Sequence, residues 1–289
     1  HEPVVCSVAD WSRRCRRRHT EGVLSAMRLE NKAIVLTGGA SGIGREILKK
    51  LIEFKGVRIL VADLHPENVP IFPQVEAIRC DTSSPAELDQ LFDLALQRFG
   101  GIDLFIANAG FAYYEKTEAE DWVRIEHIYR TNTFSPIYCA HKMARLNRGR
   151  EFGMMITASF MGIYSLPGYS LYASTKAALD SWASAYRLEN TEKDEKGRLF
   201  ILYPVATRTN FFGPASEKVP VPWPSQSPGA VAEAAIQGIL GNQARIFPSR
   251  LSRLTLMLDR VLPATMPVYQ AMEQFKFRRW VRQRARAGG

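Results

Sequence analysis

A short apolar run followed at once by a glycine-rich turn constrains this chain more than any other feature. Residues 33–36 read Ala-Ile-Val-Leu, and residues 37–44 read Thr-Gly-Gly-Ala-Ser-Gly-Ile-Gly. The apolar run is typical of a buried parallel strand, and an amphipathic helix is expected from about residue 43 to residue 54. Glycines permit a tight turn and a close approach of the backbone to a pyrophosphate, while the N-terminus of a helix offers unpaired N–H groups. The segment therefore predicts a dinucleotide-binding site.

The rest of the chain continues this alternation of strands and helices. Amphipathic segments separate further short apolar runs, which cover residues 57–62, 75–80, 103–107, 154–158, 199–203 and 245–248. Strands and helices that alternate in this way, with right-handed crossovers, form a doubly wound parallel sheet. We therefore expect a single Rossmann-type α/β domain at residues 28–248, with about seven strands and helices on both faces of the sheet.

Polar or small residues stand directly after several of the predicted strands. Asp63 follows the second strand, 19 residues past Gly44, while Asp81, the Asn-Ala-Gly segment 108–110 and Ser159 follow the next three. Ligands of open parallel sheets bind at the carboxyl ends of the strands. A carboxylate at Asp63 can accept hydrogen bonds from the adenosine ribose and would repel a 2′-phosphate, which favours NAD over NADP. The alternative is a turn aspartate that faces solvent.

A tyrosine and a lysine stand four residues apart on the helix predicted after the fifth strand. Tyr172 and Lys176 would lie on one face of that helix, one turn apart. A fixed positive charge favours phenolate and lowers the pKa of a tyrosine towards the range in which it works as a base. The spacing alone also fits a solvated helix face.

Together these residues resemble the short-chain dehydrogenase/reductase family over residues 28 to about 248. The resemblance rests on motifs in the expected order, namely Thr37-Gly38-x-x-x-Gly42-x-Gly44, Asp63, Asp81, Asn108-Ala109-Gly110, Asn132, Ser159, Tyr172-x-x-x-Lys176, Pro204 and Thr209. It implies that Tyr172 is the catalytic acid/base and that Ser159 hydrogen-bonds the substrate oxygen. It further implies that Lys176 holds the nicotinamide ribose and lowers the pKa of Tyr172, and that Asn132 anchors a water of the proton relay.

The resemblance and the glycine-rich loop together give the expected cofactor-binding residues. These are Thr37, Gly38, Ser41, Gly42, Ile43, Gly44, Asp63, Asp81, Asn108, Ala109, Gly110, Tyr172, Lys176, Pro204, Thr207 and Thr209. Two positions depart from the family pattern. Val205 stands where a glycine usually follows the proline and could crowd the nicotinamide pocket. Ala107 replaces an asparagine that often precedes Asn108, which we regard as harmless.

Large apolar side chains dominate the segments expected to surround the substrate. They are Phe111, Tyr113, Tyr114, Phe160, Met161, Ile163, Tyr164, Phe211, Phe212 and Trp223. A lipophilic secondary alcohol or its ketone would suit such a lining. The same residues would also fit loop packing or a subunit interface.

Positive charge is concentrated at the two ends of the chain. Of the net charge of +9, residues 1–26 contribute five arginines against three acids, and residues 245–289 contribute ten basic residues against two acids. The body is close to neutral, which argues against a nucleic-acid groove across it.

Residues 1–27 are expected to be a basic arm, disordered or non-native, since Met27 directly precedes the ordered pattern. Residues 249–289 form a basic amphipathic extension, which would lie on an anionic membrane surface or pack over the substrate cleft or on a partner subunit.

The remaining features concern compartment and assembly. Cys6, Cys15, Cys80 and Cys139 lack the spacing of a disulfide framework or a zinc site, so we expect free thiols and no metal. Apolar runs are too short to cross a bilayer, which predicts a cytoplasmic protein, membrane-associated if the extension binds lipid. The family resemblance implies a homodimer or homotetramer.

Our interpretation is an NAD-dependent oxidoreductase. The alternatives are an NADPH-dependent carbonyl reductase of the same fold and a non-catalytic dinucleotide-binding sensor or scaffold.

Overall fold

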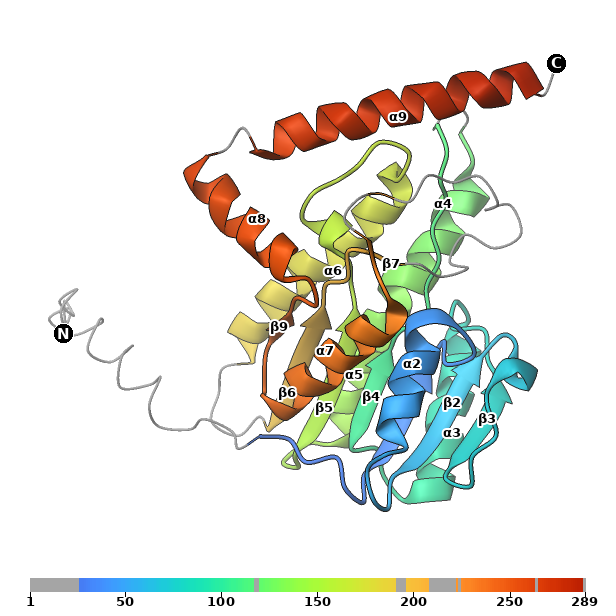
Figure 1. Ribbon diagram of the computed structural model, residues 1–289. Helices are drawn as coiled ribbons and strands as arrows, with labels where there is room; N and C mark the ends of the chain where they lie inside the picture. Colours follow the sequence, from blue (N-terminus) through green and yellow to red (C-terminus); the bar gives the residue numbers. More distant parts are fainter. Residues whose placement is uncertain are drawn as a thin grey trace, which may run out of the picture.

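A parallel seven-stranded sheet forms the centre of the computed structural model, which describes residues 26–116, 120–190, 196–207, 222, 225–262 and 265–287 (Figure 1). The strand order is β3-β2-β1-β4-β5-β6-β9. The strands are β1 (Ala33–Thr37), β2 (Arg58–Asp63), β3 (Val75–Arg79), β4 (Leu104–Ala107), β5 (Phe152–Thr157), β6 (Gly197–Leu202) and β9 (Arg245–Ile246). Each neighbouring pair is parallel, so the predicted doubly wound α/β fold is confirmed.

Helices cover both faces of this sheet and create two apolar cores. The helices of the domain are α2 (Gly42–Leu51), α3 (Pro85–Phe99), α4 (Trp122–Tyr129), α5 (Ser135–Leu146), α6 (Ser170–Glu189) and α7 (Pro228–Leu240). Alternate residues of a strand point to opposite faces. Ile34 and Leu36 accordingly pack with α2 and α7, whereas Val35 between them packs on the side of α3, α5 and α6. The apolar run that defined β1 in the sequence is thus buried from both sides.

The chain reverses its direction of travel across the sheet between β1 and β4. Strands β2 and β3 extend from β1 on one side, and β4, β5, β6 and β9 extend on the other. Crossover helices at such a switch point leave a crevice outside the carboxyl ends of the strands. The topology therefore places the ends of β1, β4 and β5 around one crevice.

A single π-helical turn runs from Arg130 to Phe134. It joins α4 to α5, and its three central residues, Thr131 to Thr133, are buried. Single π turns inside helices are frequent at functional sites because the extra residue re-aims a side chain. Here the turn includes Asn132, one of the predicted catalytic residues.

Two helices follow the last strand, α8 (Arg250–Val261) and α9 (Thr265–Ala287). Two-residue strands β7 (Ala206–Thr207) and β8 (Ser225–Gln226) and short helical turns η1 (Pro66–Asn68) and η3 (Phe160–Gly162) complete the described elements. In Figure 1, α9 lies across the top of the molecule, above the loops at the carboxyl edge of the sheet. Within the described part of the chain, no helix combines the length and apolar character needed to span a membrane. The proposed division at residues 27/28 and 248/249 stays a prediction.

Candidate active site

A cavity of about 600 Å³ lies at the carboxyl edge of the sheet. It runs from the loop after β1 and the end of β2, past the end of β4, to the end of β5 and the start of α6. The predicted site residues that line it are Gly38, Ser41, Gly42, Ile43, Asp63, Asp81, Asn108, Ala109, Gly110, Ser159, Tyr172, Lys176, Pro204 and Thr207. The two predicted groups, cofactor-binding and catalytic, therefore share one continuous cavity.

The glycine-rich loop is packed so tightly that side chains are excluded at two of its glycines. Gly38 has a φ of +70°, and a Cβ placed there would lie 2.9 Å from the Ala109 Cα atom. A Cβ on Gly44 would lie 1.9 Å from the Gly38 carbonyl oxygen. The first turn of α2 therefore lies directly against the loop. This brings the N-terminus of the helix, with its unpaired N–H groups, to the cavity, as an anionic phosphate requires.

Asp63 stands at the end of β2 and faces this loop. Its Oδ2 accepts a hydrogen bond from the Ala40 N–H at 2.9 Å, and its Oδ1 accepts one from the His65 N–H at 3.0 Å. The carboxylate also lines the cavity. Each carboxylate oxygen has further lone pairs, so Asp63 can accept ribose hydroxyls while it fixes the loop.

Asn108 ties together the ends of three strands. Its Nδ2 donates to the Gly38 carbonyl oxygen at 3.0 Å, and its Oδ1 accepts from the Thr157 hydroxyl at 3.2 Å. Thr37 Oγ1 accepts the backbone N–H groups of Asn108 and Ala109, both at 3.1 Å. These bonds give Asn108 and Thr37 a scaffolding role beneath the cavity floor.

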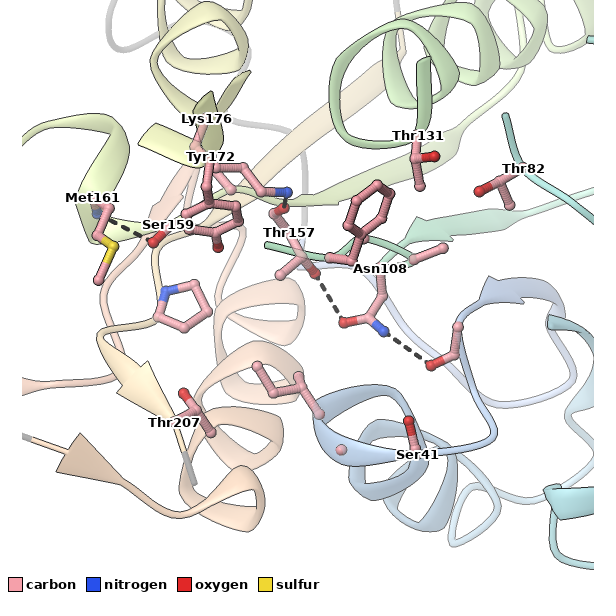
Figure 2. A pocket seen from close by; sticks show the side chains of 18 of the residues that line it. Ser41, Thr82, Asn108, Thr131, Thr157, Ser159, Met161, Tyr172, Lys176 and Thr207 are labelled. Atoms are coloured by element: carbon pink, nitrogen blue, oxygen red, sulfur yellow. Dashed lines mark hydrogen bonds between the residues drawn. The ribbon is translucent and has the colours of Figure 1, made fainter. Parts of the chain in front are cut away.

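Ser159 and Tyr172 meet at one end of the cavity, opposite Ser41 (Figure 2). Ser159 directly precedes η3, and its Oγ accepts the Met161 N–H at 3.1 Å, which fixes the side chain. Tyr172, in the first turn of α6, is 8% exposed. Burial raises the pKa of Tyr172 to about 12, against the opposing effect of its hydrogen bond with Ser159. The phenol is therefore neutral at physiological pH.

Lys176 lies one turn further along α6 and is also buried. Its Nζ donates to the Thr157 carbonyl oxygen at 2.8 Å and lies 5.8 Å from the centre of the Tyr172 ring. Burial lowers the pKa of Lys176 to about 7. In the protein without a cofactor, loss of hydration is the larger effect on the phenol. The expectation that Lys176 lowers the pKa of Tyr172 stays a prediction.

Asn132 reaches the site from the π turn. Its Oδ1 accepts the Phe111 N–H at 3.1 Å, and its Nδ2 donates to the Phe111 carbonyl oxygen at 2.8 Å and to Thr175 Oγ1 at 3.2 Å. The side chain is fully buried. Asn132 thus locks the segment after β4 to helix α6, beside the lysine.

An aromatic cluster closes the end of the cavity beyond the catalytic residues. Phe111, Met161 and Tyr169 line the cavity and belong to the same apolar cluster as Tyr172. Tyr114 packs on Tyr169 with ring centres 4.8 Å apart. This end of the cavity is therefore rich in aromatic side chains.

Some predicted site residues lie below the cavity or outside the described residues. Thr37, Gly44 and Asn132 support the lining from beneath through the contacts given above. Thr209, Phe211, Phe212 and Trp223 lie outside the described residues. Val205, the departure from the family pattern, is one of the residues that line the cavity.

Sequence reasoning missed several residues that the fold brings to the site. Thr157 bonds to both Asn108 and Lys176, and its position at the end of β5, two residues before Ser159, was an available signal. Tyr169 stands three residues before Tyr172, a spacing that puts both on one face of a helical turn. Thr175 carried no signal, because it joins the site through a buried hydrogen bond that its Oγ1 accepts from Asn132, which is distant in the sequence.

A comparison with protein-family models matches residues 32–219 to the short chain dehydrogenase family. The chain belongs to this family. Among curated relatives, an uncharacterized oxidoreductase of Mycobacterium tuberculosis is 28% identical over 254 residues, covering 82% of this chain and 72% of that protein. A 4-formylbenzenesulfonate dehydrogenase of Comamonas testosteroni is 29% identical over 177 residues, covering 56% of this chain and 68% of its own length. The family and the enzyme class, an NAD(P)-dependent oxidoreductase, are therefore confirmed.

Solved structures of family members share the fold. A short-chain dehydrogenase/reductase of Burkholderia phymatum in complex with NAD superposes with a TM-score of 0.68 at 20% identity, covering 82% of this chain and 96% of its own. A 3-ketoacyl-(acyl-carrier-protein) reductase of Brucella melitensis complexed with NADH gives 0.65 at 23% identity, covering 77% and 99%. This family's architecture accounts for the domain from β1 to β9.

Proposed function

We propose that the protein is an NAD-dependent oxidoreductase that interconverts a lipophilic secondary alcohol and its ketone, with Tyr172 as the acid/base. The observation that carries this proposal is the buried meeting of Tyr172 and Ser159 at the end of the dinucleotide-shaped cavity, with Lys176 alongside. A nicotinamide cofactor supplies a hydride acceptor or donor when bound. Related structures carry NADH, NAD and NADP, which supports such a cofactor here.

The residues at this end of the cavity suit a coupled proton transfer. The neutral Tyr172 phenol can donate its proton to a ketone oxygen, and Ser159 Oγ can donate a second hydrogen bond as negative charge develops there. In the oxidation direction Tyr172 must act as phenolate. A positive charge close to the phenol favours that form, and Lys176 provides one when it is protonated.

The preference for NAD rests on Asp63. Its carboxylate lies at the cavity wall, held by the Ala40 and His65 N–H groups. A 2′-phosphate next to a fixed carboxylate would meet like-charge repulsion, whereas two ribose hydroxyls can both donate to it. NAD therefore fits this wall better than NADP.

The apolar end of the cavity supports a lipophilic substrate. Phe111, Met161 and Tyr169 offer large apolar surfaces next to Ser159 and Tyr172. Apolar walls with a few placed polar groups are the usual form of a site for an apolar small molecule. A secondary alcohol attached to a hydrocarbon body would bury that body against these rings.

Three further properties are proposed with this activity. Association with an anionic membrane surface through residues 249–289 follows from the basic and apolar character of that extension. A homodimer or homotetramer and a cytoplasmic location stay predictions, which sedimentation and cell fractionation would check.

The proposed function is tested with Tyr172→Phe, because this change removes only the phenolic hydroxyl. Turnover of a panel of secondary alcohols and ketones, followed by nicotinamide absorbance, should fall by about 10²–10⁴-fold while NAD binding persists. The matched control is Tyr138→Phe, whose hydroxyl donates to Asp89 on the surface, away from the cavity. Tyr172→Phe activity equal to that of the control would refute the mechanism. NAD binding without turnover of any panel member would favour a sensor or scaffold.

A further inference from the structure

Among the described residues, the outward face of α8 carries an exposed apolar stripe. Leu251, Leu254 and Leu258 recur at three- and four-residue steps and are 42%, 51% and 42% exposed. Met257 beside them is 65% exposed. This spacing puts the side chains on one side of the helix. The opposite side holds Ser252, which is buried.

The outward face of α9 continues this apolar character and then becomes basic. Val268, Met272 and Phe275 recur at four- and three-residue steps, and two of them are about 70% exposed. Along the same side of the helix, Arg279 and Arg282 follow, also exposed. Figure 1 shows α9 as the outermost element on this side of the molecule, with α8 below its beginning.

Acidic groups of these two helices point inward. Asp259 accepts hydrogen bonds from the Tyr164 hydroxyl at 2.7 Å and from the Met266 N–H at 3.3 Å. Glu273 is 8% exposed and pairs with Lys276 at 2.6 Å. Among the described side chains of both helices, the exposed charges are therefore all positive, and belong to Arg250, Arg253, Arg278, Arg279 and Arg282.

The inward face of α9 packs on the wall of the substrate cavity. Trp280, which is 8% exposed, and Phe277 contact the Tyr114 ring with centroid distances of 4.7 and 5.6 Å. Tyr114 in turn packs on Tyr169, which lines the cavity. Gln270 Nε2 donates to the Ser165 carbonyl oxygen at 2.9 Å and anchors the start of the helix. The helix thus separates the cavity wall from the outward apolar and basic face.

We infer that the outward faces of α8 and α9 dock on an anionic lipid bilayer, and that the substrate is an alcohol or ketone dissolved in that bilayer. The charge pattern favours a lipid bilayer as the partner, because exposed arginines beside exposed apolar groups match anionic headgroups next to the acyl boundary. A second copy of this chain would bring the same arginines against one another. The inference on substrate source rests on the proposed function and names where the lipophilic substrate resides.

The docking is tested by co-sedimentation of the full chain with phosphatidylcholine vesicles, with and without phosphatidylserine. We expect binding to the phosphatidylserine vesicles that salt weakens, and at least about tenfold weaker partition for Leu254→Asp/Phe275→Asp and for Arg278→Glu/Arg279→Glu. Leu188→Asp, at an α6 position that is 76% exposed, is the matched control and should bind like the wild type. Equal binding of all variants, or none by the wild type, overturns the docking. If the substitutions change only the molecular mass measured by sedimentation velocity, and not vesicle binding, then the face is an interface with a second copy of the chain. That result likewise overturns the docking.

The source of the substrate is tested by kinetics with two alcohols. Leu254→Asp/Phe275→Asp should leave turnover of a short, water-soluble secondary alcohol unchanged and lower turnover of a long-chain one presented in phosphatidylserine vesicles by at least about tenfold. Equal turnover of the vesicle substrate by variant and wild type overturns delivery from the bilayer. Absence of turnover with every substrate is a failure of the proposed function instead, and the vesicle binding then still decides the docking.

Discussion

The Lys176 ammonium donates a hydrogen bond to the carbonyl oxygen of Thr157 at 2.8 Å, inside the protein. The hydroxyl of the same Thr157 donates to Asn108 Oδ1, so one residue at the end of β5 connects the segment after β4 to helix α6. Burial lowers the pKa of Lys176 to about 7 and raises that of Tyr172 to about 12. The protein alone therefore keeps the phenol protonated, and any positive charge that enters the cavity shifts it towards phenolate.

The buried lysine should make folding stability depend on pH. Its pKa of about 7 in the folded protein is below the ordinary 10.5, so above pH 7 the unfolded chain binds more protons than the folded one. Stability due to this group is lowest below pH 7 and rises with pH, by at most about 1.4 kcal/mol per pH unit. Denaturant unfolding of the wild type and of Lys176→Met between pH 6 and pH 9, without cofactor, measures this as a difference in slope. Parallel curves for the two proteins would contradict the prediction.

Asp63 has two functions that two substitutions should separate. Asp63→Asn keeps an oxygen for the Ala40 N–H but removes the charge, whereas Asp63→Ala removes both. We expect Asp63→Asn to reduce discrimination against NADP on the order of tenfold, because the repulsion of the 2′-phosphate is lost. Asp63→Ala should in addition weaken both cofactors, because the loop loses its hydrogen bond. Binding of NAD and NADP by calorimetry measures the two effects. If Asp63→Asn prefers NAD over NADP as strongly as the wild type does, the carboxylate only holds the loop and does not select the cofactor.

Asn132 should matter for stability as well as for turnover. Asn132→Ala removes three hydrogen bonds of a buried side chain and leaves the N–H and carbonyl groups of Phe111 without this partner. A loss of about 2–4 kcal/mol in the free energy of unfolding is expected from buried polar groups left unsatisfied. Thr131→Ala is the control, since its hydroxyl bonds only to the His127 carbonyl within the same helix. If both variants unfold at similar denaturant midpoints, Asn132 does not stabilise the contact between the segment after β4 and helix α6.

The fold and the first half of the site follow from local sequence, and the remainder depends on tertiary burial. The strand, glycine-rich turn and helix at residues 33–51 are contiguous in the sequence, so a dinucleotide-binding function can be predicted for them without the rest of the chain. The sequence pattern does not reveal the π turn at Asn132, because the residues on both sides of it keep a helical period. The effect of burial on the Tyr172 pKa was not predicted, since spacing gives the distance to a lysine but not the loss of hydration. Of the alternatives for residues 249–289, Trp280 shows packing on the domain, whereas Phe275 is exposed and membrane association stays a prediction.

Gly168 joins the substrate end of the cavity to α9, and Gly168→Ala tests that link. The residue has a φ of +86°, and an added Cβ would lie 2.4 Å from the Tyr114 ring and 3.0 Å from that of Phe277. The ring contacts are short and the backbone conformation is strained for alanine, so Tyr114 and α9 must shift. We expect a loss of about 1–3 kcal/mol in the free energy of unfolding and a raised KM for lipophilic substrates, with NAD affinity unchanged. Gly100→Ala shares a positive φ of 74° but has open space around its Cβ position, so it reports the backbone strain alone. If both variants lose equal stability and keep the wild-type KM, the contact between Tyr114 and Phe277 does not shape the substrate site.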